Sequence, residues 1–175
     1  RQETGSFLVF ARTKRGADRL SKKLASDGLK TVAIHGDRSQ NQRNQALRGF
    51  QEGDYRVLVA TDVAARGIHV DGISHVVNYD LPQVPEDFIH RVGRTARMGA
   101  SGRASTFATP SERAAIAQIE RAIDCKLVRR PVAPGLEREQ KPAGAVIVIP
   151  SAPAEAQRLR RSFRTRAKGG RRRAV

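Results

Sequence analysis

The sequence is poor in cysteine and contains no long apolar run. Cys125 is the single cysteine among 175 residues. One thiol forms no disulfide within the chain and cannot build a cysteine-rich zinc site, which favours a reducing, cytoplasmic setting. No apolar stretch approaches the roughly 20 residues of a membrane-spanning helix, and the start RQETGSFLVF does not resemble a secretory signal, so we expect no membrane association by a span. Because the chain begins without methionine, we expect a piece of a longer polypeptide.

Basic residues far outnumber acidic ones. Thirty-three Lys and Arg against seventeen Asp and Glu give a net charge of +16. The C-terminal residues 156–175 form an arginine-rich tail that we expect to be solvated and disordered, because it has too little apolar surface to bury a core. A polyanion is its natural partner, and nucleic acid is our first interpretation; an acidic protein surface or an anionic membrane are the alternatives. The basic residues of this tail are Arg158, Arg160, Arg161, Arg164, Arg166, Lys168, Arg171, Arg172 and Arg173.

Short apolar runs alternate with segments of helical period. Such alternation predicts an α/β fold, in which a parallel sheet is flanked by helices. In that fold, functional residues lie on the loops beyond the carboxyl ends of the strands. The predicted strands are 7–10, 31–34, 56–60, 75–79 and 103–108, and the predicted helices begin near 15, 40, 86 and 111.

The pattern decays near residue 127, where prolines become frequent. We therefore predict one folded domain over 1–130, a Pro/Ala-rich linker over 131–155 and the basic tail over 156–175. The apolar run AVIVI at 145–149 either packs back on the domain or belongs to the linker, and we interpret it as linker.

Arginines recur every three residues in the stretch HRVGRTARMGASG at 90–102, with Gly93 between the first two. Glycine permits close approach of a backbone or a ligand, and the planar guanidinium matches phosphate oxygens. The stretch is therefore suited to stabilising charge on a transferred phosphoryl group. Taken alone, a basic surface helix paired with acids explains it equally well.

Three further polar stretches each follow a predicted strand. ATDVAARGIHV at 60–70 places an acid beside the third strand, although a helix cap explains that stretch alone better. HGDRSQNQR at 35–43 combines a helix start with arginine, which is a ready phosphate site but also ordinary capping. FARTK at 10–14 is weak evidence by itself.

The four stretches together resemble motifs IV, IVa, V and VI of superfamily 2 helicases, and they are most similar to those of DEAD-box RNA helicases. LVFARTK resembles motif IV, the Q-x-x-R within HGDRSQNQR resembles motif IVa, ATDVAARG resembles motif V, and HRVGRTAR resembles motif VI. The resemblance covers residues 7–125, and a RhlE-like bacterial branch is compatible with RGIHV.

This resemblance implies the second RecA-like domain of a helicase core, a P-loop-NTPase-type fold. Arg94 and Arg97 would be arginine fingers for the γ-phosphate of ATP, and His90 would couple the ATP site to the neighbouring domain. Gly67 and His69 would lie near the ribose of ATP, where the family usually has an acid in place of His69. Asp62, Arg66, Arg91 and Gly93 would support the site. The residues implied along the RNA backbone are Thr13, Gly36, Gln40, Arg43 and Thr61.

The sequence has no G-x-x-x-x-G-K-[ST] loop and no D-E-A-D run. The resemblance places both in a preceding RecA-like domain, which would bind most of the ATP and Mg²⁺. We therefore expect an RNA-dependent ATPase and helicase in the complete polypeptide, and an inactive fragment in isolation. Two other functions stay open: a non-catalytic RNA-binding or chaperone module, and a DNA-directed superfamily 2 translocase domain.

Overall fold

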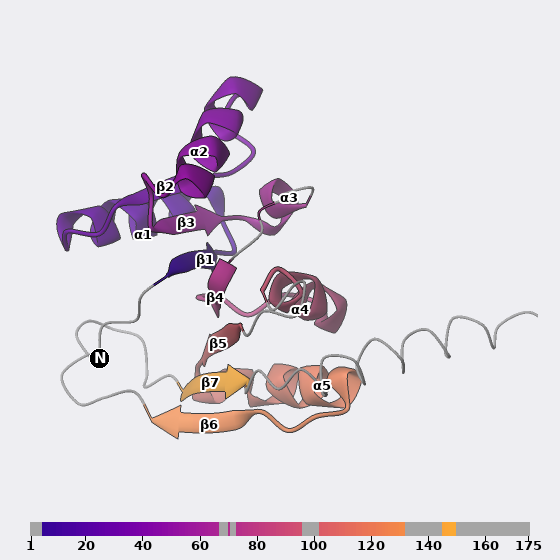
Figure 1. Ribbon diagram of the computed structural model, residues 1–175. Coiled ribbons are helices and arrows are strands. Elements are labelled where there is room, and N and C mark those ends of the chain that lie inside the picture. Colours follow the sequence, from indigo (N-terminus) through magenta and orange to yellow (C-terminus); the bar gives the residue numbers. More distant parts are fainter. Residues whose placement is uncertain (1–4, 67–69, 71–72, 96–101, 132–144, 150–175) are drawn as a thin grey trace, which may run out of the picture.

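A computed structural model describes residues 5–66, 70, 73–95, 102–131 and 145–149 (Figure 1). Several predicted features lie outside these residues: Gly67 and His69, the second expected finger Arg97, and the basic tail at 156–175.

Five parallel strands make up most of the sheet, as the sequence predicts. Their order is β2-β3-β1-β4-β5, so β1 lies in the middle. Leu8 of β1 is in register with Leu58 of β3 and Val76 of β4. All three side chains are fully buried, as expected of strands covered on both faces. The bounds are β1 Ser6–Phe10, β2 Thr31–Ile34, β3 Val57–Ala60, β4 Ile73–Asn78 and β5 Arg103–Ala108.

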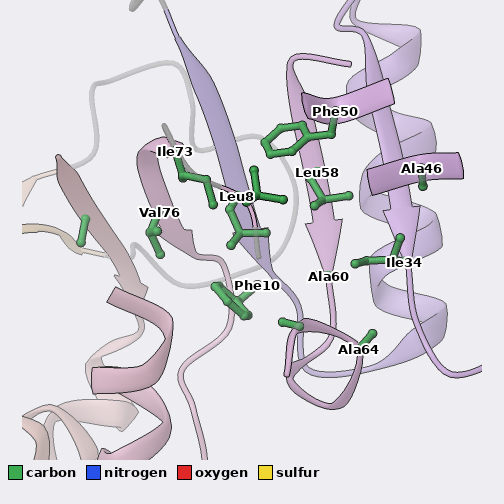
Figure 2. Packing of buried hydrophobic residues seen from close by; sticks show 13 residues of the cluster. Leu8, Phe10, Ile34, Ala46, Phe50, Leu58, Ala60, Ala64, Ile73 and Val76 are labelled. Carbon is green, nitrogen blue, oxygen red and sulfur yellow. The ribbon is translucent and has the colours of Figure 1, made fainter. Parts of the chain in front are cut away.

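Helices cover both faces of this sheet. Ala46 and Phe50 of α2 pack with Leu8 and Leu58, as Figure 2 shows. Successive strand residues point to opposite faces, and α1 packs on the other one, with Ala17 against Val9 and Val59. Within the described residues, none of the helices is both long and apolar enough to span a membrane. The helices are α1 Lys14–Ser26, α2 Gln40–Glu52, α3 Asp62–Ala65, α4 Pro85–Val92, the 3₁₀ turn η1 Pro110–Glu112 and α5 Arg113–Ile123.

Capping side chains fix where the helices start. Ser39 caps α2, with a reciprocal pair of bonds to Gln42. The hydroxyl of Thr13 accepts the Gly16 N–H at the start of α1. Gly53 ends α2 with a φ of +86°, a conformation that glycine adopts without strain.

Two antiparallel strands extend the sheet beyond β5. Strand β7 (Ala145–Ile149) pairs with β5 and with β6 (Val128–Pro131), so β6 lies at the edge. The interpretation of 145–149 as linker is therefore wrong. Its β-branched run pairs with the backbone of β5, which would otherwise be an open edge. The remaining boundaries of the linker and the tail stay predictions.

Candidate functional site

The polar residues singled out in the sequence gather at one edge of the sheet. Strands β1 to β5 are parallel, so the loops after them meet at their carboxyl ends (Figure 1). Thr13 follows β1, Gly36 follows β2 and Thr61 follows β3. Helix α4, which ends just before Gly93 and Arg94, packs on β4 and α5 at the same sheet.

A buried arginine organises this edge. Arg91 of α4 is 2% exposed, and its guanidinium forms a two-pronged ion pair with Asp62, with N–O distances of 2.6 and 2.7 Å. It also donates to the Asn78 side-chain oxygen at 3.2 Å and to the Asp80 carbonyl at 2.7 Å. The guanidinium lies over the ring of Phe10, with its carbon Cζ 4.9 Å from the ring centroid. Arg91 thus joins α4 to the ends of β1, β3 and β4.

Asp62 has a different local role from the one that the sequence alone favours. A helix cap by Thr61 or Asp62 is the simpler explanation of ATDV, yet Thr61 makes no side-chain cap bond to α3. The Asp62 carboxylate binds Arg91, 29 positions away. The Asp62–Arg91 pair cannot be read from the sequence alone, because it forms only when α4 packs on the ends of the strands.

A small pocket lies beside Arg91 and is bordered by the charged residues of α3 and α4. Its volume of about 20 Å³ holds about one or two water molecules. Arg66 closes one side through an ion pair with Asp87 at 3.3 Å. His90 lies 4.0 Å from the same carboxylate, with its side chain 73% exposed. The charged and polar lining residues are Asp62, Arg66, Asp87, His90, Arg91 and Arg94.

Gly93 permits the turn that brings Arg94 to this pocket. The Arg94 N–H donates to the Arg91 carbonyl at 3.1 Å, directly after α4. A Cβ atom at Gly93 would meet the Ile89 carbonyl oxygen at 3.1 Å, tighter than most real contacts. Arg94 is half-buried and lines the pocket, whereas Arg97 lies outside the described residues.

A second polar group lies at the ends of β1 and β2. Thr13, Gly36 and Gln40 are all exposed there. Arg43 of α2 donates to Gln40 at 3.4 Å and to the Ala64 carbonyl of α3 at 3.2 Å. Arg43 therefore connects the start of α2 with the α3 segment that holds Asp62.

Comparison with known proteins decides the family. The helicase conserved C-terminal domain family matches residues 1–99. The chain belongs to this family.

Related proteins place the domain among DEAD-box proteins. The RNA helicase CshA of Bacillus subtilis is 49% identical over 122 residues, which are 70% of this chain and 25% of CshA. Vasa of Drosophila melanogaster is 48% identical over 116 residues, 66% of this chain and 18% of vasa. The helicase C-terminal domain described here thus spans about a quarter or less of these relatives.

Solved structures confirm the RecA-like fold. Escherichia coli SrmB, solved in complex with the regulator RraA, has a TM-score of 0.73 and 33% identity, covering 81% of this chain and 83% of that one. A DEAD-box protein from Methanococcus jannaschii has a TM-score of 0.66 and 44% identity, covering 70% of this chain and 34% of that one. The expected DEAD-box C-terminal domain is therefore confirmed, and the RhlE-like branch stays a prediction.

Sequence reasoning missed several residues of this helicase C-terminal domain. Asn78 and Asp80 hold Arg91, yet neither lies in the four polar stretches that the sequence singles out. His35 and Asp18 form a bonded pair next to Gly36. The available signal was their position, since Asn78 and His35 lie at or just after the carboxyl end of a strand.

Hydrogen bonds keep two acids near these loops ionised. Partial burial opposes ionisation of Asp18, but bonds from His35 and Arg38 outweigh it and lower the pKa of the Asp18 carboxyl. The bond from Lys14 lowers the pKa of Asp37 in the same way. Within the part of the chain that the structure describes, no three His, Cys, Asp or Glu side chains gather as metal ligands.

Proposed function

We propose that this domain is the C-terminal half of an ATP-dependent RNA helicase of the DEAD-box type. A preceding domain would supply the P-loop and the D-E-A-D residues, and the two would couple ATP hydrolysis to local RNA unwinding or RNP remodelling. The observation that carries the proposal is the pocket beside the buried Arg91, where Arg94 and His90 meet at the edge that also presents Thr13, Gly36 and Gln40.

On the ATP side, this chain offers half of a site. The pocket of about 20 Å³ is far too small to enclose a nucleotide. Arg94 would reach the γ-phosphate when the preceding domain closes on this edge, and Arg97 would do the same. Arginines held ready for developing charge on a phosphoryl group are an effective way to accelerate its transfer.

The residues around the pocket would be held by Arg91. Its bonds to Asp62, Asn78 and Asp80 fix α4, and therefore the turn at Gly93 that carries Arg94. Asp87 binds Arg66 and lies near His90, so closure of the preceding domain could shift both contacts together. Gly67 and His69 would lie near the ribose of ATP. Carboxylates of the preceding domain would hold Mg²⁺, which would neutralise charge on the phosphates.

On the RNA side, the contacts would be to phosphate and sugar. Thr13, Gly36 and Gln40 are exposed, and Arg43 is half-buried beside them. Thr61 is 6% exposed, so its contribution would be mostly through the backbone. Such contacts position RNA without reading its bases. The arginine-rich tail at 156–175 would add sequence-independent affinity. A cytoplasmic location fits this function and is part of the proposal.

The decisive experiment measures ATP hydrolysis by the full-length polypeptide, with and without RNA. We expect RNA to stimulate turnover, and Arg94→Ala to lower the stimulated kcat by about a thousandfold or more. Arg121→Ala, an exposed arginine in α5, is the matched control and should retain the activity. Isolated residues 1–175 should not hydrolyse ATP.

Other results would favour the alternatives. A binding or chaperone module would show an ATP hydrolysis rate that RNA does not change. Its affinity for RNA would depend neither on ATP nor on Arg94. Stimulation by DNA with directional movement would indicate a DNA translocase. Retained activity in Arg94→Ala would contradict the assignment of the arginine finger.

A further inference from the structure

Helix α1 is bonded to the loop between β2 and α2 by side-chain ion pairs. Lys14 and Asp18 are four residues apart on α1 and therefore lie on the same face of the helix. Lys14 pairs with Asp37 at 2.5 Å, and Asp18 accepts a bond from Arg38 at 2.8 Å. Two ion pairs of opposite direction thus connect one turn of α1 to residues 37 and 38.

His35 is the buried centre of this contact. It is 3% exposed, and its Nε2 lies 3.0 Å from the Asp18 carboxylate. The backbone N–H of Asp37 donates to its Nδ1 at 3.3 Å. The Asp37 N–H can donate only to an Nδ1 that carries no proton, so this geometry fits the tautomer in which Nε2 holds the proton and donates to Asp18.

We propose that His35 is a positioning residue for the RNA backbone. With its proton on Nε2, it ties the turn at 35–38 to α1 and so holds Gly36 and the start of α2 at a fixed distance from Thr13. The proposal rests on the RNA-binding function above and assigns a role to a residue that does not itself touch RNA.

The geometry around Gly36 explains why the turn must be held. A Cβ atom at Gly36 would meet the Lys14 side chain at 3.2 Å, so the loop and α1 already lie close together. Ser39 caps α2 three residues later, and its side chain accepts the Gln42 N–H in the first turn of that helix. Phosphate binding gains most when such donors are in place before the ligand arrives. His35 supplies the buried link that keeps them there.

Other roles for His35 fit the contacts less well. Both ring nitrogens have partners within the chain, Asp18 and the Asp37 N–H, so neither is available as a proton acceptor for a ligand. No cluster of metal ligands surrounds it within the residues that the structure describes.

The first test is the tautomer of His35 in the 175-residue chain. Long-range ¹H–¹⁵N NMR spectra distinguish a protonated Nε2 from a protonated Nδ1. We expect the pattern of a neutral ring with the proton on Nε2, and an altered pattern in Asp18→Ala. A proton on Nδ1 at neutral pH would overturn the proposal, because the Asp37 N–H would then face a donor.

The second test follows RNA binding residue by residue. Oligouridylate is titrated into the ¹⁵N-labelled chain, and the amide signals of Gly36 and Gln40 are followed separately from those of the arginine-rich tail. We expect His35→Ala to raise the apparent Kd at these amides about tenfold, the scale of one charge-assisted hydrogen bond. His35→Gln keeps a donor toward Asp18 and should recover part of the loss.

His75→Ala is the matched control, since this histidine bonds Ser105 on the strands, away from the loop. It should retain the wild-type Kd. Asp18→Ala provides a second variant at a half-exposed position, should His35→Ala fail to fold. Wild-type affinity in folded His35→Ala or Asp18→Ala would overturn the proposal. No response of Gly36 and Gln40 in the wild type would overturn the RNA-binding function itself, and this inference with it.

Kinetics of the full-length polypeptide separate the positioning role of His35 toward RNA from the role of Arg94 in ATP hydrolysis. His35→Ala should raise the RNA concentration for half-maximal ATPase activity about tenfold, with kcat at saturating RNA retained. Arg94→Ala should instead lower kcat. A fall in kcat alone for His35→Ala would contradict a positioning role toward RNA.

Discussion

Two clusters of charge at the same edge of the sheet are held in opposite ways. At α4, Arg91 is 2% exposed and its partners are Asp62, Asn78 and Asp80 of this chain. After β2, the side chains of Lys14 and Asp37 are 53% and 65% exposed. Water screens an exposed pair and competes for it, whereas a buried guanidinium cannot exchange partners without a large penalty. The first cluster is therefore a fixed joint, whereas the exposed Lys14–Asp37 pair can exchange its bond with solvent.

The largest effect should follow removal of the buried cation. Arg91→Met replaces the guanidinium with an apolar chain and leaves the Asp62 carboxylate without its partner. We expect the free energy of unfolding to fall by about 3–5 kcal/mol, measured by urea denaturation of the 175-residue chain. Arg121→Met, on an exposed face of α5, should change it little. An unchanged midpoint for Arg91→Met would show that the joint is dispensable for folding.

A buried acid away from this edge tests whether burial alone makes an ion pair important for stability. The Glu120 side chain is 4% exposed and accepts bonds from the Leu127 N–H at 3.0 Å and from Lys126 at 3.2 Å. The Leu127 bond, helped by Lys126, outweighs burial and lowers the pKa of Glu120. We expect Glu120→Gln to lower the free energy of unfolding at pH 7 by about 1–3 kcal/mol.

The same acid gives a pH dependence of defined sign. Because the pKa of Glu120 is lower in the folded state, its contribution is complete above the ordinary glutamate value of about 4.3 and is lost as pH falls through the folded value. Urea midpoints measured downward from pH 6 should fall less steeply in Glu120→Gln than in the wild type. Parallel curves would contradict this origin of the acid sensitivity.

The smallest effect belongs to the exposed pair. Lys14→Ala removes the partner of Asp37, and solvent replaces the bond on both sides. We expect no measurable change in the urea midpoint. A loss as large as that of Glu120→Gln would erase the distinction between the fixed and the exchangeable cluster.

Much of the architecture could be predicted from local patterns. The strands at 31–34 and 103–108 have the predicted bounds, and the other three predicted strands differ by one or two residues at one or both ends. The Ser39 cap was also predictable, because a serine with glutamine three residues later satisfies both ends of a capping box. Cap and strand signals are local, so the sequence displays them directly.

The α5 start shows where local signals compete. The sequence predicts a helix from about residue 111, but Ser111 lies inside the turn η1 and α5 begins at Arg113. Thr109 precedes that turn, and its N–H and hydroxyl both bind the Glu112 carboxylate at 2.8 Å. Thr109 has a glutamate three residues later, as a capping box requires, whereas Ser111 has Ala114 there, so the full pattern favours Thr109.

The sequence by itself determined the order of the five parallel strands and their helices, the family and the side chains offered at the carboxyl edge. Tertiary structure decided how those side chains are used. It paired Asp62 with Arg91 across 29 positions, buried His35 against α1 and added 145–149 to the sheet. These outcomes depend on which distant surfaces exclude water together. Burial raises the free-energy cost of every unpaired charge and every open strand edge. Which residues become buried is not visible in the linear sequence pattern.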